Sequence, residues 1–346
     1  MSEKGLELKL VQELAETGRA PQGRYVLRED DRPDCTPPVA SDIPIIDLRR
    51  LLQCDDESEK LRYAVQSWGI FHVIGHELPP SFVDELRDVT RTFFKLPVEE
   101  KQKYSNLKSG EFDFEGYGND LVASEDQILD WNDRLYLLVQ PEDKRKLDYW
   151  PENPSSFREM LHEYAMKTRK ITEIVLIALA KILKLDENCF KDQVDDRAEV
   201  FARFNYYPSC LRPELVHGVK PHSDGSVITI LLPDKEVEGL QVLQDADWVK
   251  IPIIRDALVI NMGNQMEVMS NGIFKSPVHR VVTGSKERTS IAMFFLLQPE
   301  KMLEPTQGLV SETRPCLYRK MKAKDFLKAF FDKFAQGQTT IQWLRF

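Results

Sequence analysis

Residues 221–232 read Pro-His-Ser-Asp-Gly-Ser-Val-Ile-Thr-Ile-Leu-Leu and place a His-x-Asp pair directly before a run of β-type residues. About 55 residues further on, His279 stands between an Asn-Gly turn and another β-type run. Alternate side chains of a strand share a face, so His222 and Asp224 can converge on one ion. His279 can return beside them if the sheet rolls up. Two imidazoles and one carboxylate are the ligand set that holds Fe(II) with adjacent positions open; the same three residues could also bind Zn(II) or form a structural polar cluster.

A second pattern, Arg288-Thr-Ser290, follows nine residues after His279. Arg288 and Ser290 point to the same face of a strand. A guanidinium can bind a carboxylate through two bonds, and a hydroxyl can add a third. The pair therefore predicts an anchor for an acidic co-substrate, which a zinc site or a structural cluster would not need. The preceding Lys-Glu also fits a polar hairpin tip, in which Arg288 would be a solvated surface charge.

The pattern of apolar residues changes from helical to extended at about residue 198. Seven short β-type runs follow, separated by Gly, Pro, Asn and Asp: 199–206, 226–232, 240–244, 249–254, 257–262, 279–283 and 289–298. So many short strands in about 100 residues indicate a double-stranded β-helix, or jelly roll. The predicted fold class is α+β, with a mainly β core and flanking helices.

The N-terminal half shows mostly helical periodicity. Helical patterns cover residues 1–20, 58–68, 80–104 and 155–185, with short strands at 43–48 and 69–75 and a loop-rich stretch at 105–150. A last amphipathic helix is expected at 322–335. We therefore expect three units: a helical N-terminal region (1–197), the metal-binding jelly roll (198–300) and a C-terminal helical lid (301–346).

Composition narrows the classes of partner. The 346 residues are 42% hydrophobic and 30% charged, with a net charge of −9 and no basic arm, which argues against nucleic acid. We see no secretory signal and no apolar run long enough to span a membrane. The five cysteines are scattered and suggest free thiols in a reducing compartment. We expect a cytoplasmic monomer that binds a small molecule.

Together the motifs resemble one family, the plant 2-oxoglutarate- and Fe(II)-dependent dioxygenases, which include flavonoid, gibberellin and alkaloid oxidases. The resemblance covers nearly the whole chain and rests on these stretches: Ile43-Pro-Ile-Ile-Asp-Leu, Trp68-Gly-Ile-Phe, Glu115-Gly-Tyr-Gly, Arg203-Phe-Asn-Tyr-Tyr-Pro, His222-x-Asp, Gly239-Leu-Gln-Val, Ser270-Asn-Gly, Lys275-Ser-Pro-Val-His-Arg-Val and Arg288-x-Ser. Two further stretches, 129–135 and 314–322, are similar to the branch of rice enzymes that hydroxylate β-triketone herbicides.

This resemblance implies a role for each motif. His222, Asp224 and His279 would ligate Fe(II). Arg288 and Ser290 would hold the distal carboxylate of 2-oxoglutarate, assisted by Tyr207 and Asn205, which alternate onto one strand face. The implied reaction uses O2, with ascorbate as a stimulant, and passes through Fe(IV)=O. It hydroxylates, demethylates or desaturates a small organic molecule and releases succinate and CO2.

Three departures from the family pattern stand out. The family usually shows Asn-His-Gly where this chain has Gly75-His76-Glu77, and Gly-Asp where it has Gly263-Asn264. The hairpin between His279 and Arg288 is one residue short. A neutral Asn264 would loosen a loop near the iron or alter a contact to a ligand. No departure touches a ligand.

Substrate contacts are expected from one strand face and from an aromatic lid. Phe294 and Arg203 should look into the barrel mouth, while Phe112, Phe114 and the terminal Phe346 could form the lid. An aromatic pocket with one cation suggests a planar or terpenoid-like acid or diketone, either a β-triketone-like xenobiotic or a specialised or hormone-like metabolite.

Some features of this prediction remain open or without a role. His217 has no evident function and is interpreted as a loop-exposed residue. The alternatives to an oxygenase are a jelly-roll metal protein with another activity and a non-catalytic binding protein on the same fold.

Overall fold

The computed structural model describes residues 10–34, 37–338 and 341–346. Within these residues the helices are α1 (Val11–Glu16), α2 (Asp55–Tyr63), α3 (Pro80–Phe94), α4 (Val98–Gln102), α5 (Phe157–Ile182), α6 (Asn264–Met269) and α7 (Ala323–Ala335). A π-helical turn, Ala64–Trp68, continues α2. The first nine residues of the expected N-terminal helix lie outside the described residues.

The strands, in chain order, are β1 (Ile45–Asp47), β2 (Ile70–Ile74), β3 (Gly116–Gly118), β4 (Asp133–Gln140), β5 (Val200–Tyr207), β6 (Val219–His222), β7 (Ile228–Leu232), β8 (Leu240–Gln244), β9 (Asp247–Lys250), β10 (Leu258–Met262), β11 (His279–Val281), β12 (Arg288–Phe295), β13 (Met302–Leu303) and β14 (Met321–Lys322).

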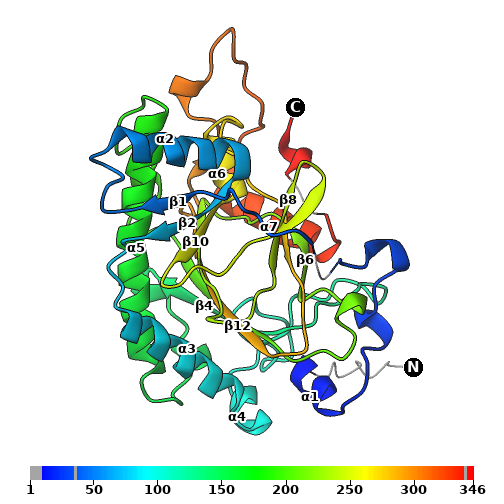
Figure 1. Cartoon of the computed structure of the whole chain (residues 1–346). Coiled ribbons are helices and arrows are strands. Elements are labelled where there is room, and N and C mark those ends of the chain that lie inside the picture. The colour runs from blue at the N-terminus through cyan, green and yellow to red at the C-terminus, as the bar shows by residue number, and fades with distance from the viewer. Residues whose placement is uncertain (1–9, 35–36, 339–340) are drawn as a thin grey trace.

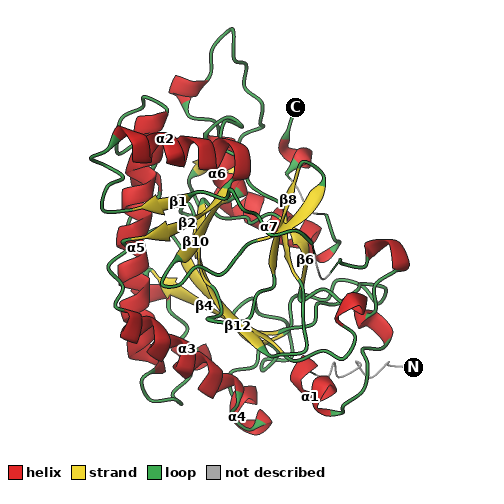
Figure 2. Ribbon diagram, viewed as in Figure 1, coloured by secondary structure: helices red, strands yellow, loops and turns green. Residues whose placement is uncertain are grey.

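Two sheets face each other and confirm the jelly roll (Figures 1 and 2). The larger sheet has the order β1-β2-β10-β7-β12-β5-β4-β3, and the smaller one β6-β11-β8-β9. Apart from the parallel pair β1–β2, neighbours in both sheets run antiparallel. Six of the seven strands expected between residues 198 and 298 form with ends shifted by at most three residues, whereas the run expected at 249–254 overlaps β9 by only two residues, and β6 was not expected.

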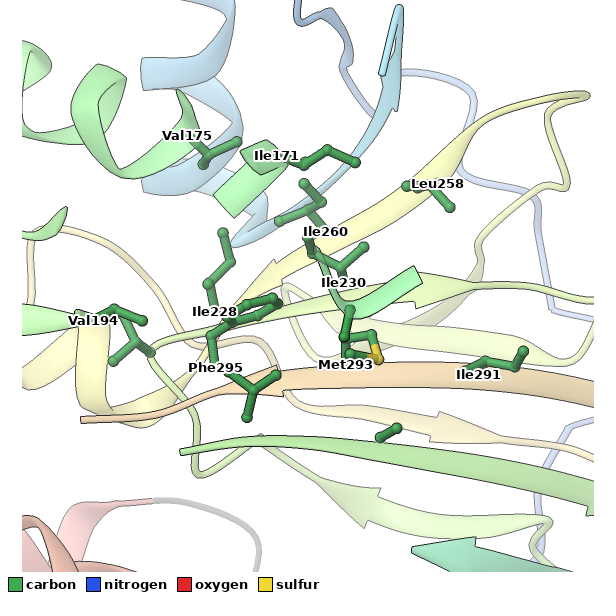
Figure 3. Close-up of a cluster of buried hydrophobic side chains, with 14 of the residues drawn as sticks. Ile171, Val175, Val194, Ile228, Ile230, Leu258, Ile260, Ile291, Met293 and Phe295 are labelled. Atoms are coloured by element: carbon green, nitrogen blue, oxygen red, sulfur yellow. The ribbon is translucent and has the colours of Figure 1, made fainter. Parts of the chain in front are cut away.

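Helices cover the outer face of the larger sheet. The long helix α5 runs beside that sheet, with α2 and α3 on the same side (Figure 1). Figure 3 shows Ile171 and Val175 of α5 above Ile260, Ile230 and other apolar side chains of the sheet. Burial of this apolar face, at about 25 cal/mol per Å², is the main term that holds helices and sheet together.

Alternation along a strand places the remaining side chains of the same strands on the inner face, where polar and apolar residues are mixed. On β12, Ile291 and Met293 point toward the helices, whereas Arg288 and Ser290 line the space between the sheets. The alternation seen in the sequence therefore decides which side chains can reach a site inside the roll.

The N-terminal half holds more β structure than its helical pattern indicates. It supplies β1–β4 to the larger sheet, and β4 lies in the stretch expected to be a loop. All eight residues of β4 are buried, including Asp133 and Arg134, so its sequence shows no alternation of polar and apolar residues. Within the described part of the chain, no helix has the length and apolar character that a bilayer crossing requires.

Candidate active site

Three side chains converge at one open end of the roll. His222 ends β6, His279 begins β11, and the two are paired in the register of these strands. The Nε2 atom of His222 lies 3.4 Å from Oδ1 of Asp224, and that of His279 lies 3.6 Å from the same oxygen. Atoms that bind one ion at about 2.1 Å and at right angles are about 3 Å apart, so the spacing suits a shared metal.

Backbone contacts orient both imidazoles. Nδ1 of His222 lies 2.8 Å from the carbonyl oxygen of Lys220, and Nδ1 of His279 lies 3.1 Å from that of Pro277. An Nδ1–H that donates to these carbonyls leaves the Nε2 lone pairs facing Asp224. Burial, together with the neighbouring His222, lowers the pKa of His279 to about 4, so its ring is neutral, as metal binding requires.

Hydrogen bonds also orient the carboxylate of Asp224 for metal binding. Its Oδ2 accepts hydrogen bonds from Thr229 Oγ1 at 2.6 Å and from Asn261 Nδ2 at 2.8 Å, while Oδ1 faces the imidazoles. Burial alone would raise the pKa of this carboxyl. His279, His222 and Asn261 outweigh burial and keep the pKa below its usual range, so Asp224 is an anion.

The departure at Asn264 contacts the backbone of Asp224. Its backbone N–H donates to the carbonyl oxygen of Asp224 at 2.7 Å, whereas its buried side-chain Oδ1 meets no donor among the described residues. A Cβ on Gly263 would come within 1.9 Å of the Ser226 carbonyl oxygen, so glycine is required there. The segment 75–77 lies elsewhere, where His76 contacts the carbonyl oxygen of Asp256 at 2.9 Å.

Arg288 lies on the inner face of β12, in the same cavity as the three converging side chains. Only 4% of the residue is exposed, yet Nε and Nη1 have no hydrogen-bond partner within the described ranges. Its guanidinium carbon sits 4.9 Å from the centre of the Tyr207 ring. A buried cation with two free donors is costly unless an anion occupies the site, and it is not the surface charge of a hairpin tip.

Ser290 and Asn205 form a cross-strand pair beside Arg288. They are opposite each other in the register of β12 and β5, and Asn205 Nδ2 lies 3.3 Å from Ser290 Oγ. Asn205 Oδ1 in turn accepts a bond from Arg203 Nε at 2.7 Å. The amide of Asn205 thus positions the Ser290 hydroxyl.

Arg203 is not a free cation in the pocket mouth. Its Nη1 and Nη2 each lie 2.8 Å from an oxygen of Asp120, in a bidentate ion pair. Asp120 also contacts Nε of Arg134 at 3.3 Å. No sequence pattern marked Asp120, because it follows β3 in a loop and meets Arg203 only in the folded chain.

The cavity encloses about 130 Å³ and has an aromatic rim. Phe112, Phe114 and Phe294 line it as expected, together with Phe331 and Phe334 of α7. Ring centroids of Phe114 and Phe331 are 4.6 Å apart, so the loop before β3 and the C-terminal helix meet over the opening.

Two expectations are wrong. Phe346 is 79% exposed and does not line the cavity, and its backbone N–H donates to the carbonyl oxygen of Leu317 at 3.2 Å. His217 is buried, with 4% exposed, and neither ring nitrogen has a partner in the described part of the chain. Sequence reasoning also missed Thr229 and Asn261, although both follow from alternation on β7 and β10.

A jelly roll with two histidines and an aspartate at its open end, facing a buried arginine, defines the class of 2-oxoglutarate- and Fe(II)-dependent oxygenases. The chain belongs to the 2OG-Fe(II) oxygenase superfamily. That family matches residues 198–296, and the family described as non-haem dioxygenase in morphine synthesis N-terminal matches residues 43–154. The protein is therefore an Fe(II)/2-oxoglutarate-dependent dioxygenase that acts on a small molecule, and the two alternatives fall away.

The relatives include plant enzymes that are named as O-demethylases. Codeine O-demethylase of Papaver somniferum is 37% identical, over 99% of this chain and 97% of the relative. Oxoglutarate-dependent flavonoid 7-O-demethylase 1 of Ocimum basilicum is 33% identical, over 99% and 92%. A crystal structure of JOX2 in complex with 2OG, Fe and JA superimposes with a TM-score of 0.87 at 33% identity, covering 97% and 98% of the two chains. None of these places the chain in the herbicide-hydroxylating branch, which stays a prediction.

Proposed function

We propose that His222, Asp224 and His279 hold the Fe(II), and that Arg288 and Ser290 hold the distal carboxylate of 2-oxoglutarate. The unpartnered Nε and Nη1 of Arg288 carry this assignment, because they lie in the cavity that also contains the metal-binding atoms. A dicarboxylate that reaches from the iron to Arg288 would satisfy both donors. When bound, the iron and 2-oxoglutarate supply the oxidising power, and succinate and CO2 are released.

The protein positions the groups that bind the iron and 2-oxoglutarate, and it excludes water from the site. Stacking on Tyr207 keeps the Arg288 guanidinium from swinging away. Asn205 holds the Ser290 hydroxyl at the site, and Thr229 and Asn261 keep one oxygen of Asp224 turned toward the histidines. The reaction requires no general base, so these residues bind and orient rather than transfer protons.

The proposed substrate is a small, ring-bearing molecule with an apolar body. Phe112, Phe114, Phe294 and Phe331 line the same cavity as the metal-binding side chains and offer aromatic surface on which a flat ring can stack. Hydroxylation and O-demethylation start at the same kind of C–H bond, so the site suits either. A β-triketone-like xenobiotic and a specialised or hormone-like metabolite both fit.

An anaerobic titration tests the cofactor assignment. Fe(II) and then 2-oxoglutarate are added to the purified protein, and we expect a weak visible absorption band only when both are present. Iron bound without such a band would refute the role of Arg288.

A screen of ring-bearing compounds by succinate release then tests the substrate pocket. The Phe294→Ala variant should lose turnover of any active compound by tenfold or more. Equal turnover would remove the basis for Phe294 as a substrate contact.

The proposal extends to a monomer in the cytoplasm. The four cysteines within the described ranges are free, which suits a reducing compartment. Light scattering of the purified protein, and microscopy of a tagged chain in plant cells, would test these two points.

A further inference from the structure

Two arginines on the inner face of the sheet differ in how their donors are used. Arg288 keeps Nε and Nη1 without partners in the described residues. Arg203 lies on the neighbouring strand, and all three of its nitrogens are bonded: Nε to Asn205, and Nη1 and Nη2 to Asp120. Arg288 can therefore bind an anion, whereas Arg203 is already paired with the carboxylate of Asp120.

Asp120 is held firmly in this place. Besides Arg203, it contacts Arg134, whose Nη1 is bonded to the carbonyl oxygens of Phe114 and Gly116. Burial opposes ionisation of Asp120, but Arg203 and Arg134 keep its pKa below the usual range. The side chain is 21% exposed and borders the cavity. Asp120 is thus a fixed anion on the wall of the pocket.

The Asp120 carboxylate takes the position that the carboxylate of an acidic substrate would need. A bidentate pair uses both outer nitrogens of a guanidinium, as Arg203 does here. An acid could form the same bidentate pair with Arg203 only after displacing Asp120, which would leave a buried carboxylate with a weaker partner. A neutral molecule of the same shape meets no such obstacle.

We propose that Asp120 is a built-in counter-ion that makes the pocket selective for uncharged ring-bearing substrates over carboxylic acids. The inference rests on the proposed function, because it names the substrate class of the same pocket. It makes Asp120 a specificity-determining residue and gives Arg203 a role in shaping the pocket instead of binding an acid.

The test compares two probes of nearly equal shape, 2-naphthamide and 2-naphthoate. Each is titrated anaerobically into the protein loaded with Fe(II) and saturating 2-oxoglutarate, and binding is followed by the change in the visible band. We expect the wild type to bind the amide at least tenfold more tightly than the acid. In Asp120→Asn, which removes the negative charge opposite Arg203, this preference should fall by at least tenfold or reverse.

Asp126→Asn is the matched control, since it removes the same charge from an exposed position of the neighbouring loop. Its amide-to-acid preference should equal that of the wild type. A wild type that favours the acid, or an unchanged preference in Asp120→Asn, would overturn the inference. Failure of the proposed function is distinguishable, because the band itself would then be missing before any probe is added.

A smaller anion covers the case in which neither naphthyl compound enters the cavity. Acetate is titrated calorimetrically into the same loaded proteins, where saturating 2-oxoglutarate keeps it from Arg288. Asp120→Asn should bind acetate at least tenfold more tightly than the wild type or Asp126→Asn. Equal acetate binding in all three proteins would contradict a counter-ion role for Asp120.

Discussion

Arg288 and Tyr207 face each other across the antiparallel pair β12–β5, and the guanidinium lies over the phenol ring. This stacking fixes a buried positive charge at the base of the cavity without using its N–H groups. The arrangement separates two tasks: the ring holds the arginine in place, and the free donors remain for an anion.

Replacing Arg288 with Met should weaken the binding of 2-oxoglutarate and leave iron binding intact. Hydrogen bonds to a charged group contribute about 1.5–3 kcal/mol, so the 2-oxoglutarate concentration for half-maximal turnover should rise about ten- to a hundredfold. Succinate release against 2-oxoglutarate concentration measures this. The fully exposed Arg255, changed to Met, serves as the control; an unchanged requirement in Arg288→Met would dismiss the anchor.

Asp224→Ala should abolish turnover, because it removes the anionic ligand of the proposed site. Stoichiometry of bound iron after dialysis, together with succinate release, measures the loss. A variant that remains fully active at limiting iron would contradict the assignment of this carboxylate.

Asn261→Leu should reduce iron affinity without abolishing activity. The substitution removes one of the two hydrogen bonds to Oδ2 of Asp224 and leaves the ligands themselves unchanged. Loss of such a supporting contact typically lowers metal affinity by about ten- to a hundredfold. Competition with a metal chelator provides the measurement, and saturating iron should restore most of the turnover.

His217 should make the fold sensitive to acid. Burial lowers its pKa from 6.5 to about 4, so the folded state binds the proton less tightly than the unfolded state does. Stability is therefore lost as the pH falls from 6.5 to 4, by about 3 kcal/mol in total, at 1.36 kcal/mol for each pKa unit. Urea unfolding of His217→Phe should show a flatter dependence over this range. If His217→Phe keeps the pH dependence of the wild type, or if the half-exposed control His162→Phe shows the same flattening, burial of His217 is not the cause of the acid sensitivity.

Gly225 should control how α7 packs over the cavity. A Cβ there would come within 2.9 Å of the Phe330 ring, whereas a Cβ on Gly284 would meet nothing within 4 Å. Gly225→Ala should therefore loosen α7 and speed amide hydrogen exchange in residues 323–335 by about tenfold or more, since local opening then costs less free energy. Gly284→Ala should leave the exchange of this helix unchanged.

The sequence was sufficient to predict the jelly roll and the side chains that line its open end. His222, Asp224, His279, Arg288 and Ser290 belong to short motifs on alternating strands, so their residue types and spacing carry the information. The C-terminal helix was equally clear, because its aromatic residues recur with helical spacing.

Other parts of the site depend on long-range contacts that spacing does not reveal. The strand β4 escaped notice because its charged residues are satisfied inside the fold: Asp133 accepts bonds from the backbone of Val11 and Gln12. Asp120 meets Arg203 across 83 residues of chain, and only the folded structure shows that Arg203 is paired with a carboxylate. His217 looked like a loop residue, since no pattern indicated its burial.

The interleaving of strands in the larger sheet has a consequence for biosynthesis. The strand β2 pairs with β10, so Val73 has no partner until Leu258 has been synthesised. In the same way, β4 has no neighbour on one side until β5 has been synthesised. Contacts between such distant residues form slowly, and unpaired strand edges invite aggregation in the meantime. The first half of this chain should therefore be unable to complete its sheet until the second half has been synthesised.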